Sequence, residues 1–287
     1  MDLTNYTEVT ALLKRHGFHF SKSLGQNFLT AAWVPERIAE AAGLDEHTGV
    51  LEVGPGVGCL TAELSLRAGK VLCLELDRRL ESVLSETLEG RDNVEIVFTD
   101  AAKADLPALC REYLGDRTWK VCANLPYNVT TPLLTAFLEA ECFESVTVMV
   151  QKEVAERMCA GPGSKDYGAF TLLVQWYTEP ELLFPVPPHC FVPQPKVTSA
   201  VVRLRRRETP PAEVPDRDFF FRVVRAAFAQ RRKTLANALM AGFPALDRES
   251  AEAFLTGAGL DPRIRGEALS LSRFAELSRV LFCKLDK

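Results

Sequence analysis

Short apolar runs rich in β-branched residues alternate with helical patterns between about residues 30 and 155 of this 287-residue chain. The strand-like runs are residues 49–58, 70–77, 93–100, 120–127 and 145–152, and the helical patterns are residues 33–44, 60–69 and 78–88. Strands that alternate with helices form βαβ units, which place helices on both faces of a parallel sheet. The sequence therefore predicts an α/β fold built on a buried parallel sheet.

The pattern changes in the last third of the chain. Residues 180–188 and 198–207 read as two further strands, joined by a proline-rich connection as a hairpin-like antiparallel pair. Residues 206–216 contain three prolines and read as a linker, and helical patterns follow at residues 218–240, 248–260 and 271–282. We predict a sheet-containing domain over residues 1–208 and a small all-helical domain over residues 209–287.

Composition and cysteine usage narrow the class of protein. The chain is 47% hydrophobic and 25% charged, its apolar runs are strand-sized, and its N-terminus has no apolar signal region. The eight cysteines are scattered without a CxxC pair, which favours free thiols. His16 and His19 lack a third ligand nearby, so no metal site is expected. We expect a cytoplasmic protein without membrane association, and a monomer because no coiled-coil pattern occurs.

Positive charge is concentrated in one part of the chain. The net charge is −4, yet Lys196 to Lys233 contains eleven Lys or Arg against four acids, a local balance of +7. Such a patch attracts phosphates even in an acidic protein. The candidate RNA-binding residues are Arg203, Arg205, Arg206, Arg207, Arg231, Arg232 and Lys233. The alternative is a solvated edge strand protected by its charges.

A glycine loop and three polar residues follow four successive predicted strands. Gly54, Gly56 and Gly58 stand where the first strand meets a helix, in a G-x-G-x-G spacing preceded by Glu52. Glu75, Asp100 and Asn124 close the next three strands. Ligands of parallel sheets collect at the carboxyl ends of the strands, where Glu75 can accept the hydroxyls of a ribose and Asp100 an adenine amino group. The alternative is that these acids only cap the segments that follow.

The spacing of the glycines bears on the cofactor. NAD requires the longer G-x-G-x-x-G fingerprint, whose last position here is Cys59. S-adenosylmethionine has no phosphate and carries a sulfonium cation, so the shorter loop and the acidic surroundings suit it better.

The residues after the fourth strand read Asn-Leu-Pro-Tyr over 124–127. Pro126 holds Leu125 in an extended conformation, so that the Leu125 carbonyl and the Asn124 side-chain oxygen are two acceptors for one amino group. Tyr127 offers a flat face to a planar ring. The combination is typical of a site for an exocyclic amine on an unstacked base, although an Asn-Pro turn is the simpler alternative.

Motifs along nearly the whole chain resemble those of one known family. The sequence is similar to the ribosomal RNA adenine N6-dimethyltransferases of the KsgA (RsmA) type. The matching motifs are SLGQNFL (23–29), LEVGPGVGCLT (51–61), LELD (74–77), NLPYNVTTPLL (124–134), MVQKEVAERM (149–158), FVPQPKVTSAVVRL (191–204) and QRRKTLANAL (230–239).

The resemblance implies a fold and a set of site residues. The fold is a Rossmann-like, class I S-adenosylmethionine-dependent methyltransferase domain, with the N-terminal segment 1–32 lying over the cofactor and a C-terminal helical domain that binds RNA or the ribosome. The implied cofactor contacts are Asn27, Leu29, Gly54, Gly56, Glu75, Asp100 and Asn124. Asn124, Leu125 and Pro126 would hold the target amine, and Tyr127 and Phe191 would sandwich the adenine.

The implied reaction is N6,N6-dimethylation of two adjacent adenines in a loop near the 3′ end of small-subunit (16S) ribosomal RNA, on a 30S pre-particle. Three alternatives stay open. A resistance-type enzyme would methylate large-subunit (23S) RNA, although PKVTSAVVRL and Leu125 favour the small-subunit type. An assembly factor would bind RNA with catalysis secondary, and a related methyltransferase would use the same pocket on a protein glutamine.

Overall fold

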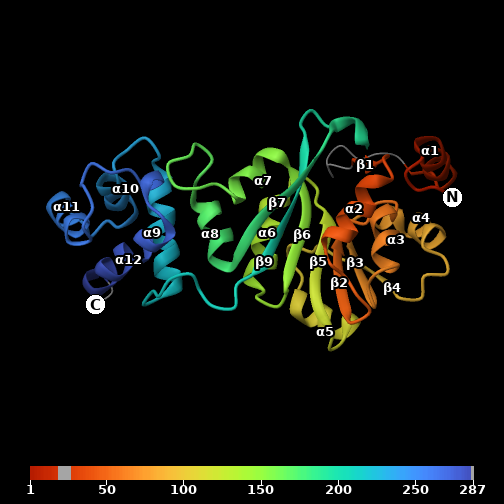
Figure 1. Cartoon of the computed structure of the whole chain (residues 1–287), viewed down its shortest axis with the longest axis horizontal. Coiled ribbons are helices and arrows are strands. Elements are labelled where there is room, and N and C mark those ends of the chain that lie inside the picture. The colour runs from red at the N-terminus through yellow and green to blue at the C-terminus, as the bar shows by residue number, and fades with distance from the viewer. Residues whose placement is uncertain (19–26, 286–287) are drawn as a thin grey trace. The chain divides into compact units, whose positions relative to one another are not determined.

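The computed structural model describes residues 1–18 and 27–285 of the chain, and Figure 1 shows the order of their elements. The first unit contains α1 (Tyr6–Arg15), β1 (Phe28–Leu29), α2 (Trp33–Ala41), β2 (Thr48–Val53), α3 (Cys59–Ser65), β3 (Lys70–Glu75), η2 (Arg78–Leu80), α4 (Glu81–Thr87), β4 (Val94–Phe98), α5 (Leu106–Leu114), β5 (Thr118–Asn124), α6 (Thr130–Glu139) and β6 (Ser145–Gln151). The chain continues with α7 (Lys152–Met158), α8 (Ala169–Tyr177), β7 (Thr178–Val186), η3 (Pro188–Cys190), β8 (Phe191–Val192), β9 (Ser199–Arg206), α9 (Arg217–Ala229), α10 (Leu235–Gly242), α11 (Arg248–Gly257), η4 (Gly266–Ala268) and α12 (Leu271–Leu285). The predicted alternation of strands and helices is confirmed.

The main sheet has seven strands in the order β4-β3-β2-β5-β6-β9-β7. Strands β2 to β6 are parallel, as predicted, and β9 runs antiparallel to β6. Strands β7 and β9 are neighbours, which agrees with the pair predicted over residues 180–188 and 198–207. Because β9 lies between β6 and β7, it is not an edge strand, and the alternative explanation of its arginines as edge protection is wrong.

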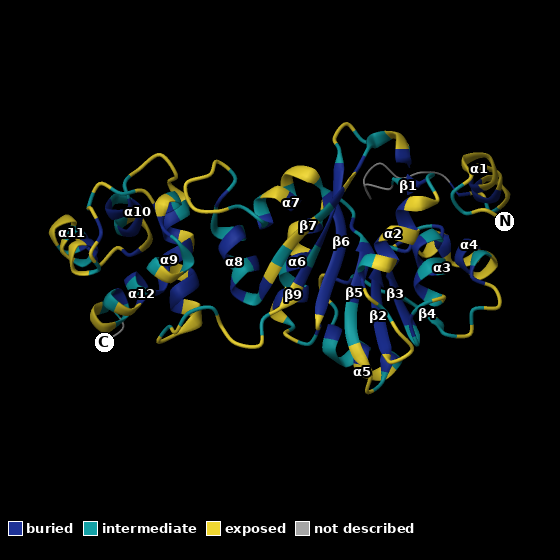
Figure 2. Ribbon diagram, viewed as in Figure 1, coloured by how far each residue is buried: buried dark blue, intermediate teal, exposed yellow. Residues whose placement is uncertain are grey.

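Both faces of the sheet are covered, which explains why its central strands are uniformly apolar. All six residues of β2 are buried, and Figure 2 shows the strand dark blue. Consecutive residues of β2 meet helices on opposite faces. Val50 packs in one cluster with Ile38 of α2 and Leu64 of α3, whereas a side-chain carbon at Gly49 would lie 2.9 Å from Leu114 of α5. A strand buried on two sides reads as a continuous apolar run.

A second, two-stranded sheet joins the N-terminal segment to the connection before β9. Strand β1 pairs antiparallel with β8, so that Phe28 lies opposite Val192 and Leu29 opposite Phe191. This pairing brings residues about 160 positions apart in the chain into contact and was not predicted. Residues 19–26, which include His19 and the first four residues of the SLGQNFL motif, lie outside the described residues.

The chain forms two compact units, residues 1–155 with 180–206 and residues 156–179 with 207–287. The predicted division at residue 208 therefore misses residues 156–179, which belong with the C-terminal helices. The physical reason is aromatic packing. Trp176 lies 4.7 Å from Phe220 and 5.7 Å from Phe221 between ring centres, and the Tyr167 hydroxyl donates to the Leu269 carbonyl at 2.8 Å.

The second unit is helical, as predicted. The side chains of Asp216, Thr234 and Asp247 accept hydrogen bonds from the first turns of α9, α10 and α11. Such caps satisfy amide groups that a helix start leaves without partners. Among residues 1–18 and 27–285, no helix is long and apolar enough to cross a bilayer, and no three His, Cys, Asp or Glu side chains are grouped as a metal site would require.

Candidate active site

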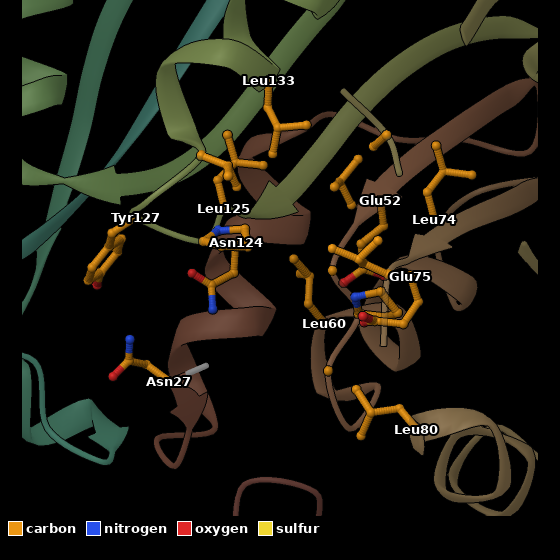
Figure 3. Close-up of a pocket in the computed structure, with 18 of the residues that line it drawn as sticks. Asn27, Glu52, Leu60, Leu74, Glu75, Leu80, Asn124, Leu125, Tyr127 and Leu133 are labelled. Atoms are coloured by element: carbon orange, nitrogen blue, oxygen red, sulfur yellow. The ribbon is translucent and has the colours of Figure 1, made fainter. Parts of the chain in front are cut away.

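The carboxyl ends of the parallel strands surround one cavity of about 410 Å³ in the first unit (Figure 3). Because β2, β3, β4 and β5 are parallel, their last residues meet at the same edge of the sheet. The predicted site residues that line this cavity are Asn27, Leu29, Gly54, Gly56, Glu75, Asp100, Asn124, Leu125, Pro126 and Tyr127. In the view of Figure 3, Asn124 lies between Tyr127 on one side and Glu75 on the other.

The glycine loop has a backbone conformation that suits glycine alone. Gly54 and Gly56 have φ angles of 72° and 61°, in the left-handed region. A side-chain carbon on Gly56 would lie 3.1 Å from the ring of Phe28, which also lines the cavity. At Gly54 and Gly56 the loop therefore presents backbone without side chains to the cavity, and at Gly56 it lies close to Phe28 of the N-terminal segment.

Replacing Gly56 with alanine is expected to weaken cofactor binding about tenfold, because the added carbon would displace Phe28 from the cavity wall. Left-handed strain of about 1–2 kcal/mol would lower the stability of the fold. Calorimetric titration with S-adenosylmethionine measures this loss. Gly90→Ala is the matched control, since Gly90 has a φ of 76° and nothing within 4 Å of the added carbon. That variant should lose similar stability and keep its cofactor affinity, and equal weakening in both variants would contradict the assignment.

Glu75, the last residue of β3, and Asp100, two residues after β4, both line the cavity. Glu75 is buried and accepts the backbone amide of Asp77 at 2.8 Å. Burial raises the pKa of Glu75, and backbone amides including that of Gly56 partly oppose this rise. Asp100 is about 37% exposed, accepts the Ala102 amide at 3.1 Å and pairs with Lys103 at 3.3 Å. Both carboxyl groups belong to the cavity wall.

Glu52 is a cavity residue that the predicted site did not include. It lies on β2, two residues before Gly54, and is only 1% exposed. The Cys73 thiol donates to its carboxylate at 3.5 Å. Burial raises the pKa of Glu52 to about 7, hydrogen bonds from Thr61 and Cys73 oppose the rise, and the nearby Glu75 adds to it. A carboxyl group that titrates near neutral pH next to a cavity is a marker of a functional site.

The Asn-Leu-Pro-Tyr loop is held to the sheet and to α6 by hydrogen bonds. Asn124 ends β5, and the Leu125 amide donates to the Met149 carbonyl at 3.1 Å. The Pro126 carbonyl accepts the Thr130 hydroxyl at 3.0 Å. The Tyr127 hydroxyl lies 2.5 Å from that of Ser199. Asn124 and Tyr127 are each partly exposed toward the cavity, so a planar group can reach both.

Phe191 is placed away from the cavity wall. It is fully buried in β8 opposite Leu29, in the apolar cluster that contains Val34 and Met149. Leu29, by contrast, lines the cavity. Among the residues that the structure describes, Tyr127 is therefore the predicted stacking residue that borders the cavity, and the stacking role of Phe191 stays a prediction.

The apolar wall of the cavity was also missed. It contains Leu60, Leu74, Leu76, Ala101 and Leu133. Leu76 and Ala101 each follow a strand-end acid directly in the sequence. That adjacency is a usable signal, because here the residue after each strand-end acid borders the same cavity as the acid.

The seven predicted RNA-binding cations fall into two groups. Arg203 and Arg205 share Glu181 at 2.7 and 3.2 Å, and Arg207 pairs with Glu179 at 2.8 Å. Arg231 pairs with Glu267 at 3.3 Å and also donates to a backbone carbonyl. The remaining three, Arg206, Arg232 and Lys233, are exposed and have no ion-pair partner within residues 1–18 and 27–285. Only the latter group offers its full charge to a partner.

Comparison with known proteins identifies a family. Residues 17–271 match the family model described as ribosomal RNA adenine dimethylase. The chain is 47% identical to the ribosomal RNA small subunit methyltransferase A of Geobacillus thermodenitrificans, over 98% of this chain and 97% of that protein. It is 48% identical to the protein of the same name from Moorella thermoacetica, over 94% and 96%.

Two solved structures share the fold over most of the chain. The 23S rRNA methyltransferase ErmE is 31% identical with a TM-score of 0.67, over 91% of this chain and all of that one. A dimethyladenosine transferase from Plasmodium falciparum is 26% identical with a TM-score of 0.71, over 90% and 98%.

Proposed function

Because the chain belongs to the ribosomal RNA adenine dimethylases, a family of S-adenosylmethionine-dependent methyltransferases, we propose that it dimethylates two adjacent adenines near the 3′ end of small-subunit (16S) ribosomal RNA. The family and the enzyme class predicted from the sequence are confirmed. The small subunit is favoured because relatives at 47–48% identity carry that name, against 31% for the 23S rRNA enzyme. A 30S pre-particle is the proposed partner.

One observation supports the site most directly. A single cavity is bordered by Glu75 at one strand end and by Asn124 and Tyr127 at another. The first acid suits a nucleoside ribose, and the second group suits an exocyclic amine on a planar ring. A methyl donor and an adenine could therefore occupy adjoining parts of the same cavity.

The described residues fit S-adenosylmethionine. The bare backbone at Gly54 and Gly56 admits a ligand at close range, Glu75 would accept ribose hydroxyls, and Asp100 would accept the adenine amino group. Asn27, Leu29 and Asn124 would complete the cofactor contacts. No phosphate-binding basic side chain lines the described part of the cavity, which favours a sulfonium cofactor over a dinucleotide. When bound, the cofactor supplies an electrophilic methyl group.

The chain's own residues would orient the target nitrogen. The Asn124 side-chain oxygen and the Leu125 carbonyl accept the two N6 hydrogens and favour a pyramidal nitrogen whose lone pair points at the methyl carbon. Tyr127 stacks on the adenine, and Pro126 fixes the direction of the Leu125 carbonyl. The bound cofactor would supply the methyl group to N6 and keep the electron pair of the S–C bond, and the N6 proton would then leave to water. Positioning and electrostatics supply the rate enhancement.

Arg206, Arg232 and Lys233 are the proposed contacts to the RNA backbone. Arg232→Gln or Lys233→Gln should each weaken RNA binding and reduce the slope of log affinity against log salt by roughly one. Filter binding at several salt concentrations measures the slope. Arg279→Gln is the matched control, because Arg279 is exposed on α12 and also lacks an ion-pair partner among the described residues. An unchanged slope in Arg232→Gln and Lys233→Gln, or an equal reduction in Arg279→Gln, would argue against these contacts.

Labelled methyl transfer tests the substrate. The protein is offered under-methylated 30S particles, naked 16S RNA and 23S RNA, and the products are digested to nucleosides. We expect N6,N6-dimethyladenosine from 30S particles. Product from 23S RNA alone would support the resistance-type activity, and tight binding to 30S particles without any methylated nucleoside would support an assembly factor.

A further inference from the structure

The hydroxyl of Tyr127 is anchored to the sheet by a serine from a distant strand. Tyr127 Oη and Ser199 Oγ lie 2.5 Å apart, although the two residues are 72 positions apart in the chain. We propose that Ser199 is a positioning residue that fixes the ring plane of Tyr127 as the stacking platform for the target adenine. The proposal rests on the assignment of Tyr127 as the stacking residue.

Ser199 is itself held rigidly. It is fully buried at the first position of β9, where it lies opposite Gln151 of β6. The neighbouring Thr198 carbonyl accepts the Lys152 amide at 2.9 Å. Because the sheet fixes the position of Ser199, its hydrogen bond limits the movement of the Tyr127 ring.

Two anchors define the orientation of an aromatic ring. The backbone of Tyr127 is held because Pro126, directly before it, accepts hydrogen bonds from the Thr130 hydroxyl at 3.0 Å and the Val129 amide at 3.2 Å. Ser199 holds the other end of the ring at its oxygen. With both ends fixed, the ring cannot swing about its Cα–Cβ bond, and its exposed face stays directed at the cavity. Pre-orientation of this kind removes an ordering cost from base binding.

The placement of Phe191 makes this anchor more important. Phe191 is fully buried and does not line the cavity, so of the two predicted stacking residues Tyr127 is the one that borders it. A base that stacks on Tyr127 depends on the orientation of that ring. Loss of the anchor should therefore affect the catalytic step more than the binding of the cofactor.

Three variants test the anchor, Ser199→Ala, Tyr127→Phe and the double substitution. Each single change removes the same hydrogen bond and keeps the ring, and should lower kcat for methyl transfer roughly five- to tenfold, the range expected for one hydrogen bond. The dissociation constant for S-adenosylmethionine should stay within twofold. The double variant should be no slower than either single variant, because the bond can be lost only once.

A buried hydroxyl without a partner provides the control. Thr147 Oγ1 lies on β6 of the same sheet and has no hydrogen-bond partner in the described part of the chain. Thr147→Val should leave kcat unchanged, and melting temperatures of all variants report any loss of folding. If Ser199→Ala is poorly folded, Tyr127→Phe tests the same bond alone.

The outcomes separate this inference from the proposed function. Wild-type transfer to 30S particles tests the substrate, whereas the variant-to-wild-type ratio on any accepted RNA tests the anchor. If Ser199→Ala lowers kcat by the same factor in the wild-type protein and in Tyr127→Phe, the proposal is overturned. The serine would then affect kcat without its hydrogen bond to Tyr127. Wild-type kcat in Ser199→Ala would overturn it as well.

Discussion

Asn124→Ala is expected to lower kcat for methyl transfer by about 10²–10³-fold, the loss typical of removing one preorganised polar group from a reaction centre. The side-chain oxygen of Asn124 is one of the two acceptors proposed for the N6 hydrogens, and it stands at the end of β5 on the cavity wall. Cofactor affinity should change only a few-fold, because Glu75 and the glycine loop supply most of the proposed cofactor contacts. Single-turnover transfer and calorimetric titration measure the two quantities separately.

Asn124→Asp provides a control of matched size. It keeps an acceptor oxygen in the same place, so it should retain more activity than Asn124→Ala. Wild-type turnover by Asn124→Ala would contradict the assignment of the acceptor. A large loss of cofactor affinity in that variant would instead assign Asn124 mainly to the cofactor.

The parallel sheet was predictable because burial on two faces leaves a direct trace in the sequence. Strands such as β2 and β6 are buried along nearly their whole length and appear as uninterrupted apolar runs. The position of residues 156–179 was not predictable. Their assignment depends on Trp176 meeting Phe220 and Phe221, which are more than 40 residues away, and no periodicity encodes such a contact.

The cavity residues were predictable to the extent that they end strands. Parallel strands bring Glu75, Asp100 and Asn124 to one edge whatever the loops do. Ser199 and Glu52 could not be recognised in the same way. Ser199 matters because the fold brings β9 close to Tyr127. The pKa of Glu52 is raised because the side chain is buried, which a single sequence does not show. The pairing of Arg203, Arg205 and Arg207 with acids of β7 was equally hidden, because strand order is not visible in a single sequence.

Burial of Glu52 should make the stability of the ligand-free protein depend on pH. The pKa of this carboxyl group rises from its ordinary value of 4.5 to about 7 in the folded chain. Below pH 4.5 the carboxyl group is protonated in both the folded and the unfolded protein, so it does not lower the free energy of unfolding. Between pH 4.5 and 7 the group ionises readily only in the unfolded protein, which favours unfolding. The free energy of unfolding therefore falls as pH rises from 4.5 to 7. Above that range the total loss is on the order of 3 kcal/mol.

Glu52→Gln removes this titration while keeping the shape of the side chain. The free energy of unfolding of Glu52→Gln minus that of wild type, measured in denaturant, should increase by about 2–3 kcal/mol between pH 5 and pH 8. Glu40→Gln is the control, because Glu40 is exposed on α2 and should leave the wild-type pH profile unchanged. Parallel profiles for wild type and Glu52→Gln would show that Glu52 titrates normally.

The same carboxyl group should couple cofactor binding to pH. S-adenosylmethionine carries a net positive charge, and a bound cation beside Glu52 favours the ionised form of the carboxyl group. Wild-type affinity should therefore increase between pH 6 and pH 8 with release of a proton, while the affinity of Glu52→Gln should stay flat over the same range. Titration calorimetry in buffers of different ionisation enthalpy counts the released protons, and equal proton release from both proteins would assign the coupling to another group.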